Sequence, residues 1–308
     1  MTEPQTQEQG GQGQGQDQPA PPLRSFLFVP GDHDRKLAKG EEAGADALIL
    51  DLEDSVAPAR KALARALVQD FLTARGGDRR SQLWVRINPP VAGGLDDLVA
   101  VVRAAPDGIM VPKIDHPREL ARLDDILTAL ERRDGVARPI RLLPVVTETP
   151  VAPFTLGAYA QTPLPRLYGL TWGAEDLGTA LGASTNKGAD GRWDFTYRMV
   201  RSLCLMAAKA CNAAAIETLF ADFRDEAGLR ADSAAAAREG FTGRIAIHPG
   251  QVAAINEAFT PSADDIAHAR RVVAAFAAEP GTAVVGLDGR MLDIPHLKQA
   301  QSILSRVP

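Results

Sequence analysis

The chain has 308 residues, of which 45% are hydrophobic and 24% charged, and its formal net charge at pH 7 is -5. This length allows one barrel domain or two ordinary domains, each with a sizeable core. The negative charge disfavours nucleic acid as the main partner. No run approaches the ~20 apolar residues of a membrane span. Two cysteines are too few for a disulfide framework, so we expect a soluble protein in a reducing, cytoplasmic environment.

Residues 1–22 are dominated by Gln, Gly and Pro. They contain no apolar stretch that resembles the core of a signal peptide and too little Arg for a transit peptide. This composition cannot bury enough apolar surface to fold, so the segment is predicted to be a disordered tail.

After this tail, short β-rich runs alternate with amphipathic helical stretches. Candidate strands lie at Ser25–Val29, Ala47–Leu52, Leu83–Ile87, Gly108–Val111, Ile140–Val146, Leu167–Thr171, Ala214–Glu217 and Ile245–Ile247. Helical patterns lie at Arg35–Ala43, Ala59–Ala74, Asp96–Ala104, Pro117–Glu131, Pro150–Gln161, Phe195–Lys209 and Ser233–Gly240. Eight nearly continuous apolar strands with intervening helices predict a (β/α)8 barrel over residues 23–250 rather than a doubly wound sheet.

The remaining segment, residues 251–308, is longer than the eighth barrel helix requires. It is predicted to hold a long helix at Ala263–Ala278, a Gly-rich turn with a short β-like run at Gly281–Gly289, and a last helix at Ile294–Leu304. Such an extension either caps the barrel or acts as a lid that reaches a neighbouring subunit. Asp293, a lone acid between Leu292 and Ile294, is the reason to consider the lid.

Two acidic groups follow predicted strands, where a parallel barrel carries its catalytic groups. Glu148 comes after the fifth strand, and the pair Glu175-Asp176 comes after the sixth. Carboxylates on one rim are suited to a hard divalent cation such as Mg²⁺. An acid here could instead cap the helix that begins near Leu177. We favour the cap for Glu175 and the metal for Glu148 and Asp176.

Asp51, Glu53 and Asp54 end the second strand, and Arg86 ends the third. This density of negative charge requires a positive partner, and both a divalent cation and the Arg86 guanidinium meet that need. An arginine in an otherwise apolar strand also needs a partner of its own. One of Glu53 and Asp54 could equally serve as the cap of a helix before Pro58.

Lys113 ends the fourth strand. A lysine at this place could act as a Schiff-base nucleophile. We favour a charge-neutralising role among the rim acids, or simple exposure, because no apolar pocket around Lys113 is visible in the sequence.

Basic residues open the first helix, at Arg35, Lys36 and Lys39, just after a Pro-Gly turn. A helix N-terminus favours anions, so this stretch is a candidate phosphate site. A solvated helix face has the same pattern.

Nine motifs, in order, resemble the citrate lyase beta subunit-like family of CoA-ester lyases, within the HpcH/HpaI aldolase superfamily. They cover the chain from Arg24 onward, and the similarity is greatest to the malyl-CoA and citramalyl-CoA lyase branch. The motifs are RSFLFVPGD, LDLEDSVAPARK, VRIN, VPK, VTETP, GAEDLG, ETLFADFRDEAGL, GFTGRIAIHPGQV and GRMLDIP.

The resemblance implies a TIM barrel with a C-terminal lid, assembled as a homotrimer or hexamer with shared active sites. It implies Mg²⁺ held by Glu148 and Asp176, and Arg86 on the substrate oxygens. It also implies that Asp293, supplied by a neighbouring protomer, moves a proton between the acetyl carbon and its thioester enolate.

For coenzyme A, the resemblance implies that the phosphates meet Arg35 and Lys39 and that the nucleotide lies near Phe28, Ile245 and Ala246. Phe28 departs from relatives that have a tyrosine there, and the Gln-rich tail is not explained by the family.

The sequence therefore predicts a Mg²⁺-dependent lyase that cleaves or forms a 3-hydroxyacyl-CoA such as malyl-CoA or citramalyl-CoA. The products are acetyl-CoA or a homologue with glyoxylate or pyruvate, and no redox cofactor is implied. Catalytic candidates are Arg86, Asp293, Glu53 and Asp54. Two alternatives stay open, a thioesterase acting on the same CoA esters and a citrate lyase subunit acting on an acyl carrier.

Overall fold

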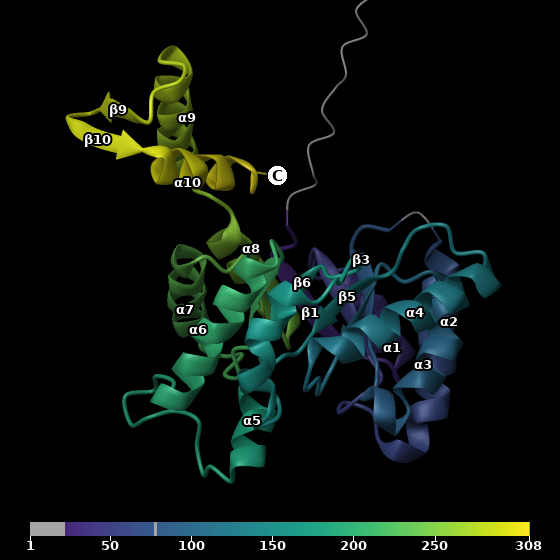
Figure 1. Ribbon diagram of the computed structural model, residues 1–308. Helices are drawn as coiled ribbons and strands as arrows, with labels where there is room; N and C mark the ends of the chain where they lie inside the picture. Colours follow the sequence, from purple (N-terminus) through teal and green to yellow (C-terminus); the bar gives the residue numbers. More distant parts are fainter. Residues whose placement is uncertain (1–21, 77–78, 308) are drawn as a thin grey trace, which may run out of the picture. The chain divides into compact units, whose positions relative to one another are not determined.

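The computed structural model describes residues 22–76 and 79–307 (Figure 1). Of the predicted tail, only Pro22 lies within the described residues. The described chain divides into two compact units between Pro261 and Ser262. No helix in the described ranges is long and apolar enough to cross a membrane.

Eight parallel strands form the barrel of the larger unit, in the order β5-β4-β3-β2-β1-β8-β7-β6. Two isolated parallel bridges, Leu142–Leu167 and Val145–Thr171, join the β5 and β6 sides. The predicted (β/α)8 barrel is confirmed. The strands are β1 (Ser25–Pro30), β2 (Ala47–Asp51), β3 (Gln82–Arg86), β4 (Gly108–Val111), β5 (Arg141–Pro144), β6 (Gly169–Thr171), β7 (Ala214–Glu217) and β8 (Gly243–Ala246).

Two apolar layers hold this barrel, because successive side chains of a strand point to opposite faces. Residues such as Phe26, Ile49 and Trp84 form the inner cluster. Their strand neighbours belong to the larger cluster between strands and helices. Gly108 makes room for Trp84, since a Cβ at Gly108 would lie 2.2 Å from atoms of the Trp84 ring.

Helices follow the strands around the larger unit (Figure 1). The α-helices are α1 (Asp34–Glu41), α2 (Lys61–Arg75), α3 (Gly94–Val101), α4 (Pro117–Asp134), α5 (Ala174–Leu181), α6 (Phe195–Ala210), α7 (Glu226–Glu239) and α8 (Val252–Phe259). Short 3-10 helices are η1 (Pro58–Arg60), η2 (Pro90–Ala92), η3 (Val102–Ala104), η4 (Ala152–Gln161) and η5 (Pro249–Gln251).

Two of the predicted barrel helices were wrong in type or extent. The stretch predicted as a helix at Pro150–Gln161 forms the 3-10 element η4. Helix α7 begins at Glu226 rather than Ser233, because the Asp225 side chain accepts a hydrogen bond from the Gly228 N–H (2.8 Å) and caps an earlier start.

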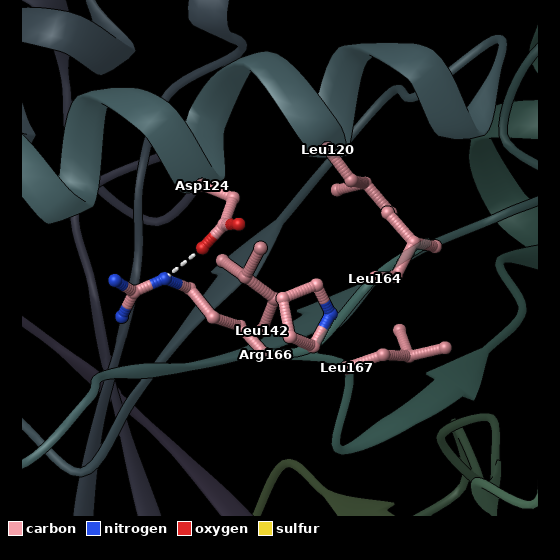
Figure 2. A pocket seen from close by; sticks show the side chains of 7 residues that line it. Leu120, Asp124, Leu142, Leu164, Arg166 and Leu167 are labelled. Carbon is pink, nitrogen blue, oxygen red and sulfur yellow. Dashed lines mark hydrogen bonds and ion pairs between the residues drawn. The ribbon is translucent and has the colours of Figure 1, made fainter. Parts of the chain in front are cut away.

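A buried ion-pair network lies beside the β5–β6 seam (Figure 2). Arg166 pairs with Asp124 of α4 and donates to both carboxylate oxygens of Glu131, at 2.6 and 2.7 Å. Its guanidinium also donates to Thr128 Oγ1 (2.8 Å) and to the Ile140 carbonyl (3.2 Å). The hollow between these residues and the nearby leucines has no room for a water molecule. The role of this region is therefore structural.

The smaller unit has its own apolar cluster, which includes Val272, Phe276 and Leu292. It consists of α9 (Ala263–Ala278), an antiparallel hairpin of β9 (Val284–Leu287) and β10 (Arg290–Asp293), and α10 (Ile294–Leu304). Both predicted helices are confirmed with these bounds. The hairpin turns at Asp288-Gly289, where both residues have positive φ, as a tight two-residue hairpin requires.

Candidate active site

Arg86 lies at the C-terminal end of β3, directly across from Asp51 in the β2–β3 register. Its Nε and a terminal nitrogen donate to the two Asp51 oxygens at 2.7 and 2.8 Å, and its other terminal nitrogen lies 2.9 Å from Glu53 Oε2. The guanidinium also sits 4.4 Å from the centre of the Phe28 ring. The predicted carboxylate partner of Arg86 is therefore present, and the arginine is held in one orientation.

The Asp51 carboxylate is buried. Burial alone would raise its pKa, but the hydrogen bonds and charge of Arg86 together lower that pKa below its ordinary value. For Glu53, by contrast, burial outweighs the nearby cations and its pKa is raised. Asp51 is thus a fixed counter-ion, while Glu53 is the less well compensated acid.

The Lys113 side chain lies close to three acids of this rim. Its ammonium nitrogen lies 2.5 Å from Glu53 and 3.5 Å from both Asp54 and Asp176. Burial alone would lower the pKa of Lys113, but the carboxylates of Glu53, Asp176 and Glu148 raise it. A Schiff-base lysine must lose its proton, so the geometry favours the charge-neutralising role.

The backbone of Lys113 contributes as well. Its φ of 54° lies in the left-handed region, which costs a non-glycine residue about 1 kcal/mol or more. In this conformation its N–H donates to Glu148 Oε2 at 2.6 Å. The strained residue therefore helps to orient the Glu148 carboxylate.

Glu148 follows β5 and has only 5% of its surface exposed. Burial, assisted by the nearby charges of Asp176 and Glu53, raises its pKa to about 8 despite the Lys113 hydrogen bond. Gly173 makes room for it, because a Cβ there would lie 2.7 Å from Glu148 Cγ. The site thus holds a buried carboxylate whose charge is incompletely compensated.

Asp176 stands in the first turn of α5, which begins at Ala174 and not near Leu177. The N-cap of α5 is Gly173, which makes no side-chain cap bond. Glu175 is therefore not the cap residue, and its carboxylate accepts a hydrogen bond from Asn186 at 3.0 Å. An uncapped N-terminus leaves backbone N–H groups available to an anion.

A pocket opens among these groups at the barrel mouth. Its polar lining includes Arg86, Glu148, Thr171, Asp176 and Thr218, and its apolar lining includes Phe28, Met110, Val145, Leu219 and Ile245. A lining that combines charged groups with apolar side chains suits a small carboxylate-bearing ligand.

Glu148 and Asp176 fit a Mg²⁺ ion. Their oxygens are the donors that Mg²⁺ prefers, and this ion is often bound through one or two carboxylates, with water and substrate oxygens completing the set. Within the described ranges, no group of three or more His, Cys, Asp or Glu is arranged to hold a metal. The protein therefore offers an open two-carboxylate site, where a divalent cation would compensate the buried Glu148 carboxylate, whose pKa is raised by burial and, to a smaller extent, by the charges of Asp176 and Glu53.

Other predicted site residues lie around this centre. Asp54 is exposed and points to Lys113. Neither Glu53 nor Asp54 caps a helix before Pro58, since the N-cap of η1 is Ala57 without a side-chain bond. Ile245 lines the pocket, but Ala246 is fully buried in the layer between strands and helices.

The remaining candidates lie outside the pocket lining. Arg35 and Lys39 are exposed on α1. Asp293 is the N-cap of α10 in the smaller unit, and its Oδ1 lies 2.5 Å from His296 Nδ1. The phosphate role and the proton-transfer role of these residues stay predictions.

Sequence reasoning named Phe28 and Ile245 as binding residues but missed the Thr171 and Thr218 side chains and the rest of the apolar lining, Met110, Val145 and Leu219. The signal was present in part, because Phe28, Met110 and Val145 occupy inward positions near strand ends. Which of these positions border an opening depends on side-chain packing across the barrel.

Comparison with known proteins adds independent findings. The family model described as HpcH/HpaI aldolase/citrate lyase matches residues 24–249. The chain is 33% identical to the mitochondrial citramalyl-CoA lyase of Mus musculus, covering 92% of this chain and 86% of that protein. It is 32% identical to a (3S)-malyl-CoA thioesterase of Cereibacter sphaeroides, covering 93% and 95%.

A solved structure is also similar. Protein CitE of Mycobacterium tuberculosis, in complex with magnesium, acetoacetate and coenzyme A, superposes with a TM-score of 0.73 at 32% identity. The match covers 93% of this chain and 98% of that one.

Proposed function

The chain belongs to the HpcH/HpaI aldolase/citrate lyase family, and on that basis we propose that it is a Mg²⁺-dependent carbon-carbon lyase. The predicted family and enzyme class are confirmed by the matches. The proposed reaction cleaves or forms a short 3-hydroxyacyl-CoA, with acetyl-CoA or a homologue and a small 2-oxo acid, glyoxylate or pyruvate, as the other side of the equilibrium.

The observation that carries this proposal is one pocket lined by Arg86, Glu148 and Asp176 beside the uncapped start of α5. A carboxylate of the substrate would meet the α5 N–H groups and the Arg86 guanidinium. A bound Mg²⁺ supplies Lewis-acid stabilisation of developing oxyanions. The relative with magnesium, acetoacetate and coenzyme A supports this choice of ligands.

The chemistry requires stabilised negative charge at two moments. Breaking the bond between the 2- and 3-carbons leaves an electron pair on the thioester side, as an enolate, and turns the alcohol into a carbonyl after loss of its proton. Arg86, fixed by Asp51 and Glu53, is preorganised to donate hydrogen bonds to such oxyanions. A further group must return a proton to the enolate carbon.

For that proton transfer we propose Asp293. Its side chain is about half exposed at the start of α10, so it is available to a ligand. The proposal includes a homo-oligomer, a trimer or hexamer, in which Asp293 of one protomer serves the pocket of another.

Product analysis tests the reaction. The enzyme is incubated with Mg²⁺, acetyl-CoA and either pyruvate or glyoxylate, and the thioesters are identified by mass spectrometry. Formation of a 3-hydroxyacyl-CoA supports the lyase, and its absence with both acids, together with no cleavage of malyl-CoA or citramalyl-CoA, contradicts it.

A hydrolase is the second candidate, because the similar Cereibacter sphaeroides protein is a (3S)-malyl-CoA thioesterase. Here water captures the thioester in the same pocket. Release of free malate or citramalate with free CoA, in place of an oxo acid, identifies this outcome.

Mixing two inactive variants tests the shared site. Asp293→Asn should bind the thioester but turn over about 10²- to 10⁴-fold more slowly. After subunit exchange with Glu148→Ala protein, hybrids should regain part of the activity, because some pockets then combine an intact Glu148 with an intact Asp293. An active wild-type monomer, or inactive hybrids shown by mass spectrometry to have formed, would reject the shared site alone.

A further inference from the structure

Thr171 ends β6 on the inside of the barrel. It lines the pocket at the mouth, yet only 2% of its surface is exposed. Its carbonyl accepts a hydrogen bond from the Val146 N–H at 2.9 Å, so its backbone is engaged across the β5–β6 seam. The backbone of Thr171 is therefore held in a fixed place in the wall of the pocket.

The Thr171 hydroxyl has no hydrogen-bond partner. Three other hydroxyls among the described residues are also buried and unpartnered, those of Tyr159, Tyr197 and Ser233. None of those three lines the pocket at the mouth. A buried hydroxyl without a partner destabilises the fold, so one that faces a ligand pocket calls for a ligand atom.

The residues that line the pocket with Thr171 restrict the kind of ligand that can supply a partner for its hydroxyl. The nearby inward side chains Met110, Val145 and Ile245 are apolar and offer no strong acceptor. Arg86, Glu148 and Asp176 line the same pocket. A nucleotide is too large to approach a residue that is almost fully buried, whereas a small ligand in this pocket borders both Thr171 and the charged groups, because they line the same pocket.

We propose that the Thr171 hydroxyl donates a hydrogen bond to an oxygen of the small 2-oxo acid, making it a substrate-contacting residue. This inference rests on the proposed function, since it names a further contact of the same pocket. The hydroxyl and the apolar wall together orient the acid, while the rim groups hold its charge.

Two substitutions distinguish the effect of the Thr171 hydroxyl from the effect of the shape of the side chain. Thr171→Val keeps the volume and removes the hydroxyl, and Thr171→Ser keeps the hydroxyl. Binding of pyruvate and of glyoxylate is measured by calorimetry with Mg²⁺ present. We expect Thr171→Val to weaken binding of the acid by about 10-fold or more and Thr171→Ser to stay close to wild type. Acetyl-CoA binding should be unchanged in both.

Thermal unfolding distinguishes a ligand-binding hydroxyl from a structural one, because loss of a structural hydroxyl lowers the melting temperature. Because the hydroxyl is unpaired within the protein, Thr171→Val should keep or raise the melting temperature. Ser233→Ala is the matched control. It removes a fully buried, unpartnered hydroxyl on α7, and it should leave binding of both acids unchanged.

The outcomes are distinct. If Thr171→Val binds both acids as wild type does, or if it lowers the melting temperature, the hydroxyl serves water or the protein and the Thr171 contact is rejected. If wild type itself binds neither acid with Mg²⁺, the proposed function fails together with this contact.

Discussion

Two arginine networks in the barrel unit differ in how their charge is balanced. Arg166, beside the β5–β6 seam, pairs with Asp124 (Figure 2). It also donates to Glu131 and fills its remaining hydrogen bonds with Thr128 and Ile140. No space for a ligand remains there. This network is complete without any further partner.

Arg86 at the mouth belongs to a different kind of cluster. With Lys113 it faces five acids, Asp51, Glu53, Asp54, Glu148 and Asp176. The acids outnumber the bases, and a pocket adjoins them. The fully paired charges around Arg166 indicate a structural network. The surplus of carboxylates over cationic side chains at the mouth indicates a site for a cation and a substrate.

The largest expected effect comes from removing the surplus acids. Glu148→Gln and Asp176→Asn should each lower Mg²⁺-dependent turnover by more than about 10²-fold, because the metal loses a ligand. Both variants should remain folded, since they remove repelling charge and Glu148→Gln keeps an acceptor for the Lys113 N–H. Turnover and melting temperature are measured together. Wild-type turnover that survives EDTA would contradict the assignment.

At the β5–β6 seam we expect substitutions to lower stability while leaving substrate binding unchanged. Glu131→Ala removes two hydrogen bonds from buried Arg166 and one from the Ile140 N–H, and should lower the free energy of unfolding by about 3 to 5 kcal/mol. The Michaelis constant of the folded fraction should not change. Arg133→Ala, which breaks an exposed ion pair on the same helix, should leave the denaturation midpoint in place. Equal effects of the two variants would show that the buried Arg166 network contributes no more to stability than an exposed ion pair.

The affinity of the pocket for Mg²⁺ is expected to depend on pH. The pKa of Glu148 is raised to about 8, so in the metal-free enzyme it is mostly protonated below that pH. Binding Mg²⁺ requires the carboxylate and releases the proton. Apparent Mg²⁺ affinity should therefore rise up to about tenfold per pH unit between pH 6 and 8 and then level off. Calorimetry in buffers of different ionisation enthalpy checks the release, and a flat affinity profile would exclude it.

The raised pKa of Glu148 also makes the stability of the metal-free protein depend on pH. In the unfolded chain Glu148 has its ordinary pKa, so between that value and about 8 the folded, metal-free protein binds the extra proton. Its contribution therefore lowers stability as pH rises through this window. With Mg²⁺ bound, this loss should disappear.

The smallest effects are expected on α1. Arg35→Ala and Lys39→Ala should each raise the Michaelis constant for the CoA thioester a few-fold with little change in turnover, because phosphate contacts far from the reacting carbon stabilise ground and transition states alike. Added salt should mimic them. Unchanged affinity of both variants at low ionic strength would place the phosphate site elsewhere.

Much of the barrel was predictable, because strands buried on both faces must be apolar at nearly every position. This pattern placed the eight strands, and Glu148 and Asp176 came just after two of them. Helix starts were less predictable, since α7 depends on one side-chain bond of Asp225 and α5 begins after an uncapped Gly173. Local side-chain chemistry of this kind leaves only a weak trace in the hydrophobic pattern.

By itself the sequence determined the fold class, the order of the elements and the ring of acids after the strands, since each follows from short-range patterning. Tertiary structure decided which groups meet. The β2–β3 register brings Asp51 opposite Arg86, the left-handed backbone of Lys113 turns its N–H toward Glu148, and the packed interior leaves the Thr171 hydroxyl without a partner. Those contacts join residues far apart in the chain, so only closure of the barrel fixes them.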